Sequence, residues 1–173
     1  ISYGSWLNNI SNSSFSLASK IGRGNIGLNI RHMGVSDLEL RSNRPTDDPL
    51  ATFSSSSFAA ASSYSQTYGA ITIGATVRYI LIQLYTENVS GMTFDGGITR
   101  SFGKNIDLGF SILNTGFINN TDSYNPVLPL RFLSALSYQF PRSNWGHKIC
   151  LSAEKSSLVN GSIIRVASET KFE

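Results

Sequence analysis

The stretch Ala70-Ile-Thr-Ile-Gly-Ala-Thr-Val-Arg-Tyr-Ile-Leu81 decides the fold class. Its odd-numbered positions, from Ile71 to Leu81, are apolar or alanine, and its even-numbered positions from Thr72 to Arg78 are small or polar. Side chains alternate between the two faces of a β-strand, so a period of two predicts a strand with one apolar face and one small or polar face.

The same alternation recurs along almost the whole chain and predicts about ten strands. Many of them are about 10 residues long, which matches a tilted membrane-spanning strand and exceeds the usual strand of a globular sheet. The expected ranges are 1–9, 13–21, 25–34, 53–64, 70–84, 92–102, 106–113, 128–140, 147–157 and 162–172. The Ser-rich segment Ser54 to Ser57 is kept within a strand because Phe58, Ala60, Ser62 and Tyr64 continue the pattern.

The connections between these strands are expected to alternate in length. Short turns are predicted at 22–24, 65–69, 103–105 and 141–146, and longer loops at 35–52, 85–91 and 114–127. Short turns at one end and long loops at the other are typical of an antiparallel, up-and-down transmembrane β-barrel. The loop after Asp37 is polar and holds Pro45 and Pro49, so it is expected to lie in water.

Composition restricts the class of protein. The chain has 173 residues, and 14 basic against 11 acidic side chains give 14 − 11 = +3, which predicts one domain, residues 1–173, and no nucleic-acid partner. Only 14% of residues are charged, fewer than a water-exposed β-sandwich carries. A transmembrane helix is excluded because Arg78 and Gln83 interrupt the best apolar window.

In a barrel the apolar faces contact lipid and the polar faces line the interior. Val77 and Leu108 are therefore predicted to face lipid, and Thr76 and Asp107 to face the interior. The other charged side chains expected to point inward, as a neutral paired network, are Arg131, Lys148, Glu154, Arg165, Glu169 and Lys171. Aromatic side chains near strand ends would suit interfacial girdles, with an ordinary core as the alternative: Trp6, Tyr85, Phe102, Tyr138, Phe140, Trp145 and Phe172.

No motif predicts catalysis, a cofactor or a metal. Gly22 to Gly27 matches the dinucleotide-binding pattern G-x-G-x-x-G, but no helix follows it, which favours a hairpin turn. His32 and His147 lack metal-ligand spacing, and Asp47-Asp48 lacks that of a calcium loop. Cys150 has no base beside it in the sequence. We therefore predict no enzyme activity, no catalytic residue and no cofactor.

The segment Ser90-Gly-Met-Thr-Phe-Asp95-Gly-Gly-Ile98 has the pattern S-G-x-x-x-D-x-G. It resembles a stretch of the PorV/PorQ-type family of bacterial outer-membrane proteins. Gly103 to Gly116 resembles its turn, strand and N-x-G segment, and Leu128-Pro-Leu-Arg131 its L-P-L segment. The strand from Gly24 to Val35, with Asp37-Leu-Glu39 after it, is similar to the strand and acidic loop that precede them.

The resemblance implies a fold similar to the 14-stranded fatty-acid transporter FadL and a role as an outer-membrane component of type IX secretion. Partners would be lipid and secretion proteins, or a hydrophobic ligand. The N-terminal A-L-G-G and N-P-A-G-L stretches of the family are missing, and the chain starts at Ile1, so a fragment or a processed product is expected. A FadL-like transporter of hydrophobic molecules and a soluble β-sandwich adhesin remain as alternatives.

Overall fold

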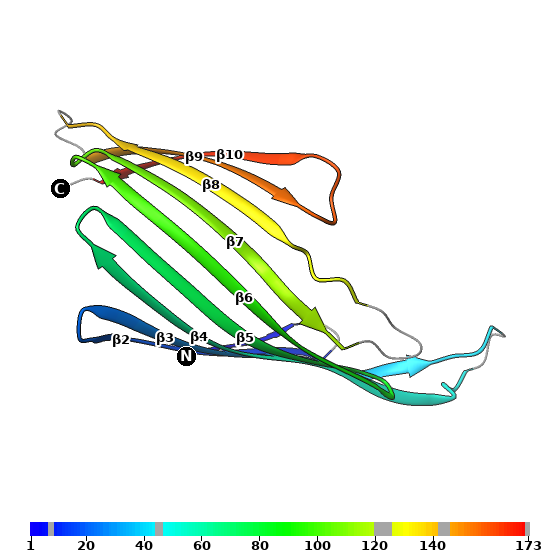
Figure 1. Ribbon diagram of the computed structural model, residues 1–173. Helices are drawn as coiled ribbons and strands as arrows, with labels where there is room; N and C mark the ends of the chain where they lie inside the picture. Colours follow the sequence, from blue (N-terminus) through cyan, green and yellow to red (C-terminus); the bar gives the residue numbers. More distant parts are fainter. Residues whose placement is uncertain (7–8, 44–46, 120–125, 142–145, 172–173) are drawn as a thin grey trace.

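The computed structural model describes residues 1–6, 9–43, 47–119, 126–141 and 146–171, and these residues form strands and no helix (Figure 1). No helix of the described chain therefore has the length and hydropathy to cross a membrane. The strands are β1 (Ser2–Trp6), β2 (Ile10–Ile21), β3 (Gly24–Leu40), β4 (Ala51–Tyr68), β5 (Ile71–Leu84), β6 (Glu87–Phe102), β7 (Ile106–Ile118), β8 (Arg131–Gln139), β9 (Gly146–Ser156) and β10 (Ser162–Lys171).

All ten strands belong to one antiparallel sheet in which each strand pairs with its neighbours in the sequence, in the order β1 to β10. The predicted all-β, up-and-down arrangement of ten strands is confirmed. The sheet is open, because β1 and β10 make no contact with each other in the described chain. Figure 1 shows the sheet curling, with the turns β2–β3, β4–β5 and β6–β7 together at one end.

Several strands are longer than predicted, and several connections are correspondingly shorter. β3 has 17 residues and β4 has 18, and β4 includes the Ser-rich segment, as expected. The predicted long loop at 85–91 is wrong, because β5 and β6 are joined by the two-residue turn Tyr85-Thr86. Asn88, Ser90 and Gly91 favour a loop in the sequence. In the structure they lie in β6, because this segment pairs with β5 from Glu87 onward and with β7 from Gly91 onward.

Glycines make two of the tight turns at one end of the sheet. Gly22 and Gly69 each begin a two-residue turn with φ of +59°, a conformation that costs a residue with a Cβ more than it costs glycine. The G-x-G-x-x-G match is thus a hairpin turn, as predicted. We call this end the turn end, and the opposite end, with residues 41–50 and the β7–β8 connection, the loop end.

β5 pairs with both of its neighbours without a register shift. Shifts occur instead where β3 passes Val35 and where β6 passes Phe94. In each case the strand with the extra residue has a polar side chain at positive φ, Asp37 at +58° and Asn114 at +60°. Aspartate and asparagine tolerate this left-handed conformation better than most residues, which explains the positions of the bulges.

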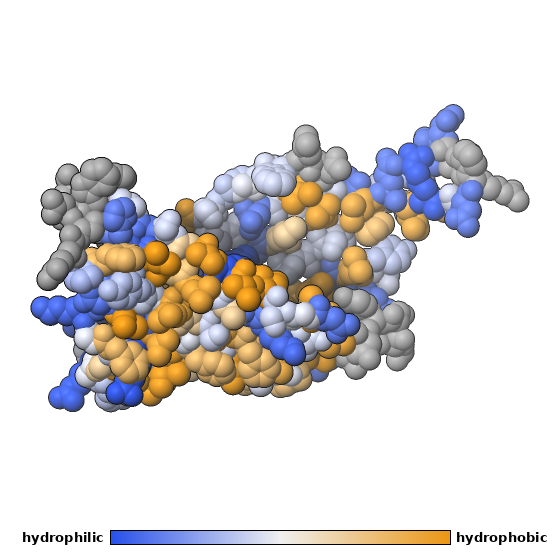
Figure 2. All heavy atoms as spheres, turned by 90° about the horizontal axis from the view of Figure 1, so that it is seen from above, coloured by the Kyte–Doolittle hydropathy of each residue, from blue (hydrophilic) through white to orange (hydrophobic). Residues whose placement is uncertain are grey.

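The apolar face of the sheet is its exposed face. Val77 is 41% exposed and Leu108 is 44% exposed, and among the described residues only Val89 is a buried hydrophobic side chain. The accessible surface is 12752 Å², whereas a folded soluble protein of this mass exposes about 8,300 Å². Figure 2 shows hydrophobic residues in a broad patch with hydrophilic ones towards the two ends. The described residues of the sheet therefore form no extended apolar core.

The close approach of β6 and β7 at the bulge gives a test of this register. In Gly116→Ala the new Cβ would overlap the carbonyl oxygen of Met92 and lie 2.9 Å from Thr93 Cα. We expect the free energy of unfolding to fall by about 1–3 kcal/mol, as in other overpacked sites. Urea titration of the refolded protein measures it. Gly96→Ala is the control, because nothing lies within 4 Å of its Cβ; equal losses for both variants would contradict the register.

Candidate functional site

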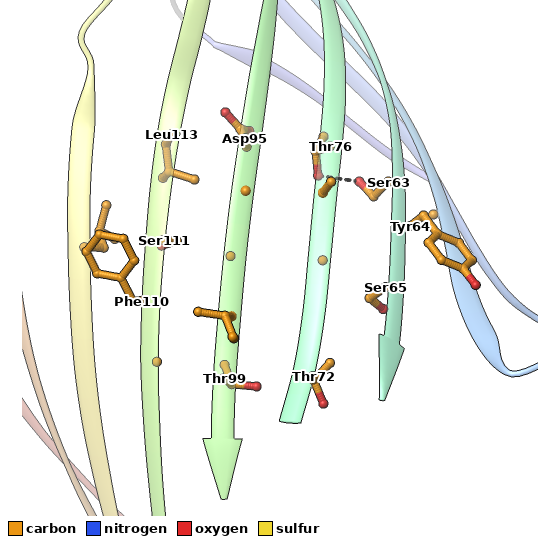
Figure 3. Close-up of a pocket in the computed structure, with 18 of the residues that line it drawn as sticks. Ser63, Tyr64, Ser65, Thr72, Thr76, Asp95, Thr99, Phe110, Ser111 and Leu113 are labelled. Atoms are coloured by element: carbon orange, nitrogen blue, oxygen red, sulfur yellow. Dashed lines mark hydrogen bonds between the residues drawn. The ribbon is translucent and has the colours of Figure 1, made fainter. Parts of the chain in front are cut away.

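The face opposite the apolar one is concave and carries the small and charged side chains. A hollow of about 690 Å³ lies along it. Figure 3 shows Ser63 and Thr76 pointing towards each other across β4 and β5, and their hydroxyl oxygens are 2.9 Å apart. Glycines contribute to the floor on several adjacent strands: Gly27, Gly74, Gly97 and Gly109. The curl and the small side chains together leave this space open.

An ion pair between β5 and β6 lies at the edge of the hollow. Arg78 Nη2 donates to Asp95 Oδ2 at 2.9 Å, and the second carboxylate oxygen accepts from the backbone N–H of Asn114 at 2.7 Å. Arg78 Nη1 also donates to Asn114 Oδ1 at 3.3 Å and to the hydroxyl of the fully buried Thr93 at 3.5 Å. Each carboxylate oxygen of Asp95 thus has a donor, and the side chain is only 11% exposed.

The bulge between β6 and β7 makes this arrangement possible. Asp95 stands opposite the inserted pair Leu113-Asn114, so the backbone N–H of Asn114 is released from the regular ladder. That N–H donates to the Asp95 carboxylate, and the Asn114 side chain donates to the carbonyl oxygen of Pro129 at 3.0 Å. The bulge therefore connects β5 and β6 to the segment that leads into β8.

A second ion cluster joins β8, β9 and β10. The Glu154 carboxylate accepts from Arg131 Nε at 2.6 Å and from Arg165 Nη1 at 2.7 Å, one bond to each oxygen. Glu154 is 6% exposed, whereas the arginine side chains are 34% and 52% exposed. Desolvation of a carboxylate is costly unless it is paired, and two guanidinium groups offset that cost here.

The two clusters are neighbours on the concave face. Arg131 pairs in register with Leu113, next to Asn114, and lies two residues after Pro129. Together they form a line of polar side chains from β5 to β10, which we call the polar belt: Arg78, Thr93, Asp95, Asn114, Arg131, Glu154 and Arg165. Three guanidinium groups and two carboxylates give the belt a formal charge of 3 − 2 = +1.

Apart from Lys171, whose side chain lies outside the described part of the structure, the predicted inward charges share this face, but they do not all pair as expected. Asp107 accepts hydrogen bonds from Ser101 and Ser137, at 2.7 and 3.1 Å, and has no ion pair in the described chain. Lys148 stands opposite Glu169 in the register of β9 and β10. Because Arg131 and Arg165 share one carboxylate, their cluster is positive and the expected neutral pairing is wrong there.

The remaining residues considered in the sequence lie apart from the belt. His32 is exposed on β3, and His147 Nδ1 is 2.9 Å from the Thr170 hydroxyl at the turn end. No three of the described His, Cys, Asp and Glu side chains gather as a metal site would need. Asp47 and Asp48 are exposed at the loop end, and Cys150 is half-buried on the concave side of β9.

Asp95 and Asn114 were not singled out as interior charges or partners from the sequence, yet they are central to the belt. A signal was present, because the three short motifs quoted above meet here. The S-G-x-x-x-D-x-G stretch contributes Asp95, the N-x-G segment contributes Asn114, and the L-P-L segment contributes the carbonyl of Pro129. Their contact follows from the bulge, which periodicity alone did not locate.

The Arg78–Asp95 pair gives a test of the belt. In Asp95→Asn the guanidinium of Arg78 loses its counter-charge, so we expect the free energy of unfolding to fall by about 1–2 kcal/mol. In an Arg78→Gln background the same substitution is expected to cost much less, which a double-mutant cycle measures by urea titration. Asp107→Asn is the control, since the hydrogen bonds that Asp107 accepts within the described chain come from serine hydroxyls. Equal costs of Asp95→Asn in both backgrounds would rule out the coupling.

Comparison with known proteins adds no family assignment. No family model matches the chain, and no curated protein sequence matches it. The argument for a function therefore rests on the residues and geometry of the sheet.

Proposed function

We propose that this chain is a bacterial outer-membrane β-barrel protein of the PorV/PorQ type, acting as a scaffold of the cell envelope or of type IX secretion. The observation that carries the proposal is the exposed apolar face of the sheet combined with a charged concave face. In water this arrangement is unfavourable, since exposed apolar surface costs about 25 cal/mol per Å². In a bilayer the same face contacts lipid, and the backbone bonds of the sheet are satisfied between strands.

The apolar face extends over neighbouring strands, as contact with lipid requires. On β3, β5, β7 and β9, seven side chains of the apolar face have exposed fractions between 43% and 50%: Leu28, Ile30, Ile73, Leu108, Phe110, Ile149 and Leu151. Exposed aromatic side chains lie near the strand ends, where they would suit interfacial girdles: Trp6, Tyr85, Phe102, Tyr138 and Phe140. Trp145 and Phe172, also predicted for the girdles, lie outside the described residues.

The open edges support a barrel that is completed by further strands. β1 and β10 each have one unpaired edge, and an unpaired edge in a bilayer leaves backbone N–H and C=O groups without partners. The 14-stranded barrel implied by the family resemblance would supply those partners. The soluble β-sandwich needs two packed sheets, whereas the described residues form one.

The polar belt on the concave face favours a scaffold over a transporter of hydrophobic molecules, because it places charged side chains across the interior. A transport path for hydrophobic molecules needs an apolar lining. One observation supports the second function: at the loop end the concave side is apolar, with Ile80, Ile82, Val89 and Ile118 on that face and Val89 only 3% exposed.

Arginine substitutions on the two faces of the sheet in β5 and β7 test the membrane proposal. Val77→Arg and Leu108→Arg place a charge against lipid at a cost of about 2–4 kcal/mol near the bilayer centre, so the folded yield in lipid vesicles is expected to fall. Thr76→Arg, on the concave face, is expected to be mild. Heat-modifiable migration on a denaturing gel measures the folded fraction. Equal losses at both kinds of position would refute the assignment of Val77 and Leu108 to lipid.

The up-and-down order tests the topology. If the turn end faces the periplasm, the exposed Ser42 lies outside the cell, because direction reverses at every strand. In a Cys150→Ser background, Ser42→Cys is expected to react with an impermeant thiol reagent on whole cells, and Arg23→Cys only after the outer membrane is disrupted. The reverse pattern would invert the topology. Asn120, an alternative position for the label, lies outside the described residues.

A further inference from the structure

The turn end of the sheet carries basic side chains that the belt does not use. Lys20 and Arg23 lie at the β2–β3 hairpin, and Arg100 and Lys104 at the β6–β7 hairpin, and all four are exposed. None of them has an ion pair within the described chain. We call these four side chains the basic rim.

Acidic residues gather at the opposite end. Asp37, Glu39, Asp47, Asp48 and Glu87 lie in or beside the loop-end connections. The described turns of the turn end, at 22–23, 69–70, 103–105 and 140–141, contain no acidic residue. The net charge of the chain is only +3, but the charges are unevenly distributed along the strands, with more basic residues at the turn end and more acidic residues at the loop end.

Aromatic side chains stand beside the basic rim. The guanidinium of Arg100 lies 4.8 Å from the centre of the Phe102 ring, and Tyr138 and Phe140 form an edge-to-face pair 4.9 Å apart. These rings are about 40% exposed. Aromatic rings and cations at the border of an apolar face are the combination found at the headgroup level of bilayers.

We propose that the basic rim binds the phosphate groups of anionic phospholipids at the surface of the leaflet that surrounds the turn end. This inference rests on the proposed membrane location and names the lipid that the turn end contacts. Arg23 and Lys104 lie in the turns, and Arg100 lies on the same face of β6 as Ile98 and Phe102, so these cations reach the headgroups while the apolar side chains reach the acyl chains. Lys20 lies next to the turn on the concave side of β2. Each such cation near an anionic surface contributes about fivefold in association, equivalent to ~1 kcal/mol.

The two turns that flank β5 allow a direct test. Position 70 is beside the rim, because the Ala70 carbonyl accepts from the Ser101 N–H at 2.8 Å, and position 86 lies at the loop end. Ala70→Cys and Thr86→Cys, each with Cys150→Ser, are labelled with a fluorophore in the full chain and reconstituted in phosphatidylcholine vesicles. Quenching by headgroup nitroxides on phosphatidylglycerol and on phosphatidylcholine is then compared at equal mole fraction.

We expect phosphatidylglycerol to quench position 70 several-fold more strongly than phosphatidylcholine, and both lipids to quench position 86 about equally at low salt. Arg100→Gln with Lys104→Gln is expected to bring the ratio at position 70 close to one. The control, Arg41→Gln with Lys155→Gln, removes the same charge from the loop end and is expected to leave that ratio unchanged.

The outcomes separate this inference from the membrane proposal. Equal quenching of position 70 by both lipids in the native chain would overturn lipid binding by the rim and leave the membrane location intact. So would an equal effect of the two double variants, because attraction by net charge alone would then explain the preference. Absence of quenching by either lipid at both positions would overturn the membrane location and the rim together.

Discussion

The ladder of backbone hydrogen bonds between neighbouring strands is the interaction on which this molecule depends. Nearly every large apolar side chain in the described chain is at least partly exposed, so burial of apolar surface within the chain does not hold the sheet together. Every strand from β2 to β9 is instead paired on both sides, and the register is continuous except at two bulges. A sheet of this kind needs an apolar environment on its outer face, and the membrane proposal follows from that need.

On the concave face, two carboxylates are hydrogen-bonded by donors from adjacent strands of the curved sheet. Asp95 and Glu154 each accept bonds through both carboxylate oxygens, from donors on different strands. A further bond of the belt connects two strands that the backbone ladder does not pair, since Arg78 on β5 donates to Asn114 on β7. Buried ion pairs are weak sources of stability but costly to break, so the belt favours one particular curvature and register over the alternatives.

Charge is also separated along the strands, with the basic rim at the turn end and acidic residues at the loop end. The belt, the hollow and the rim occupy different levels of the same sheet, and each follows from strand register. A change of one residue in register would exchange the two faces and move the charges of the belt to the apolar side. The turns and bulges, where residues adopt positive φ, therefore have a large effect on where function can lie.

The sequence by itself determined the strand number, the up-and-down order and the facing of residues such as Val77 and Asp107, because alternation with a period of two is a local property. Only the tertiary structure decided the ends of β3 and β4, the two-residue turn at Tyr85-Thr86 and the bulge at Asn114. These depend on pairing with the adjacent strand, which composition and local pattern do not report. The partners of Asp95 and Glu154 were decided in the same way, since their contacts join residues 11 to 23 positions apart in the chain.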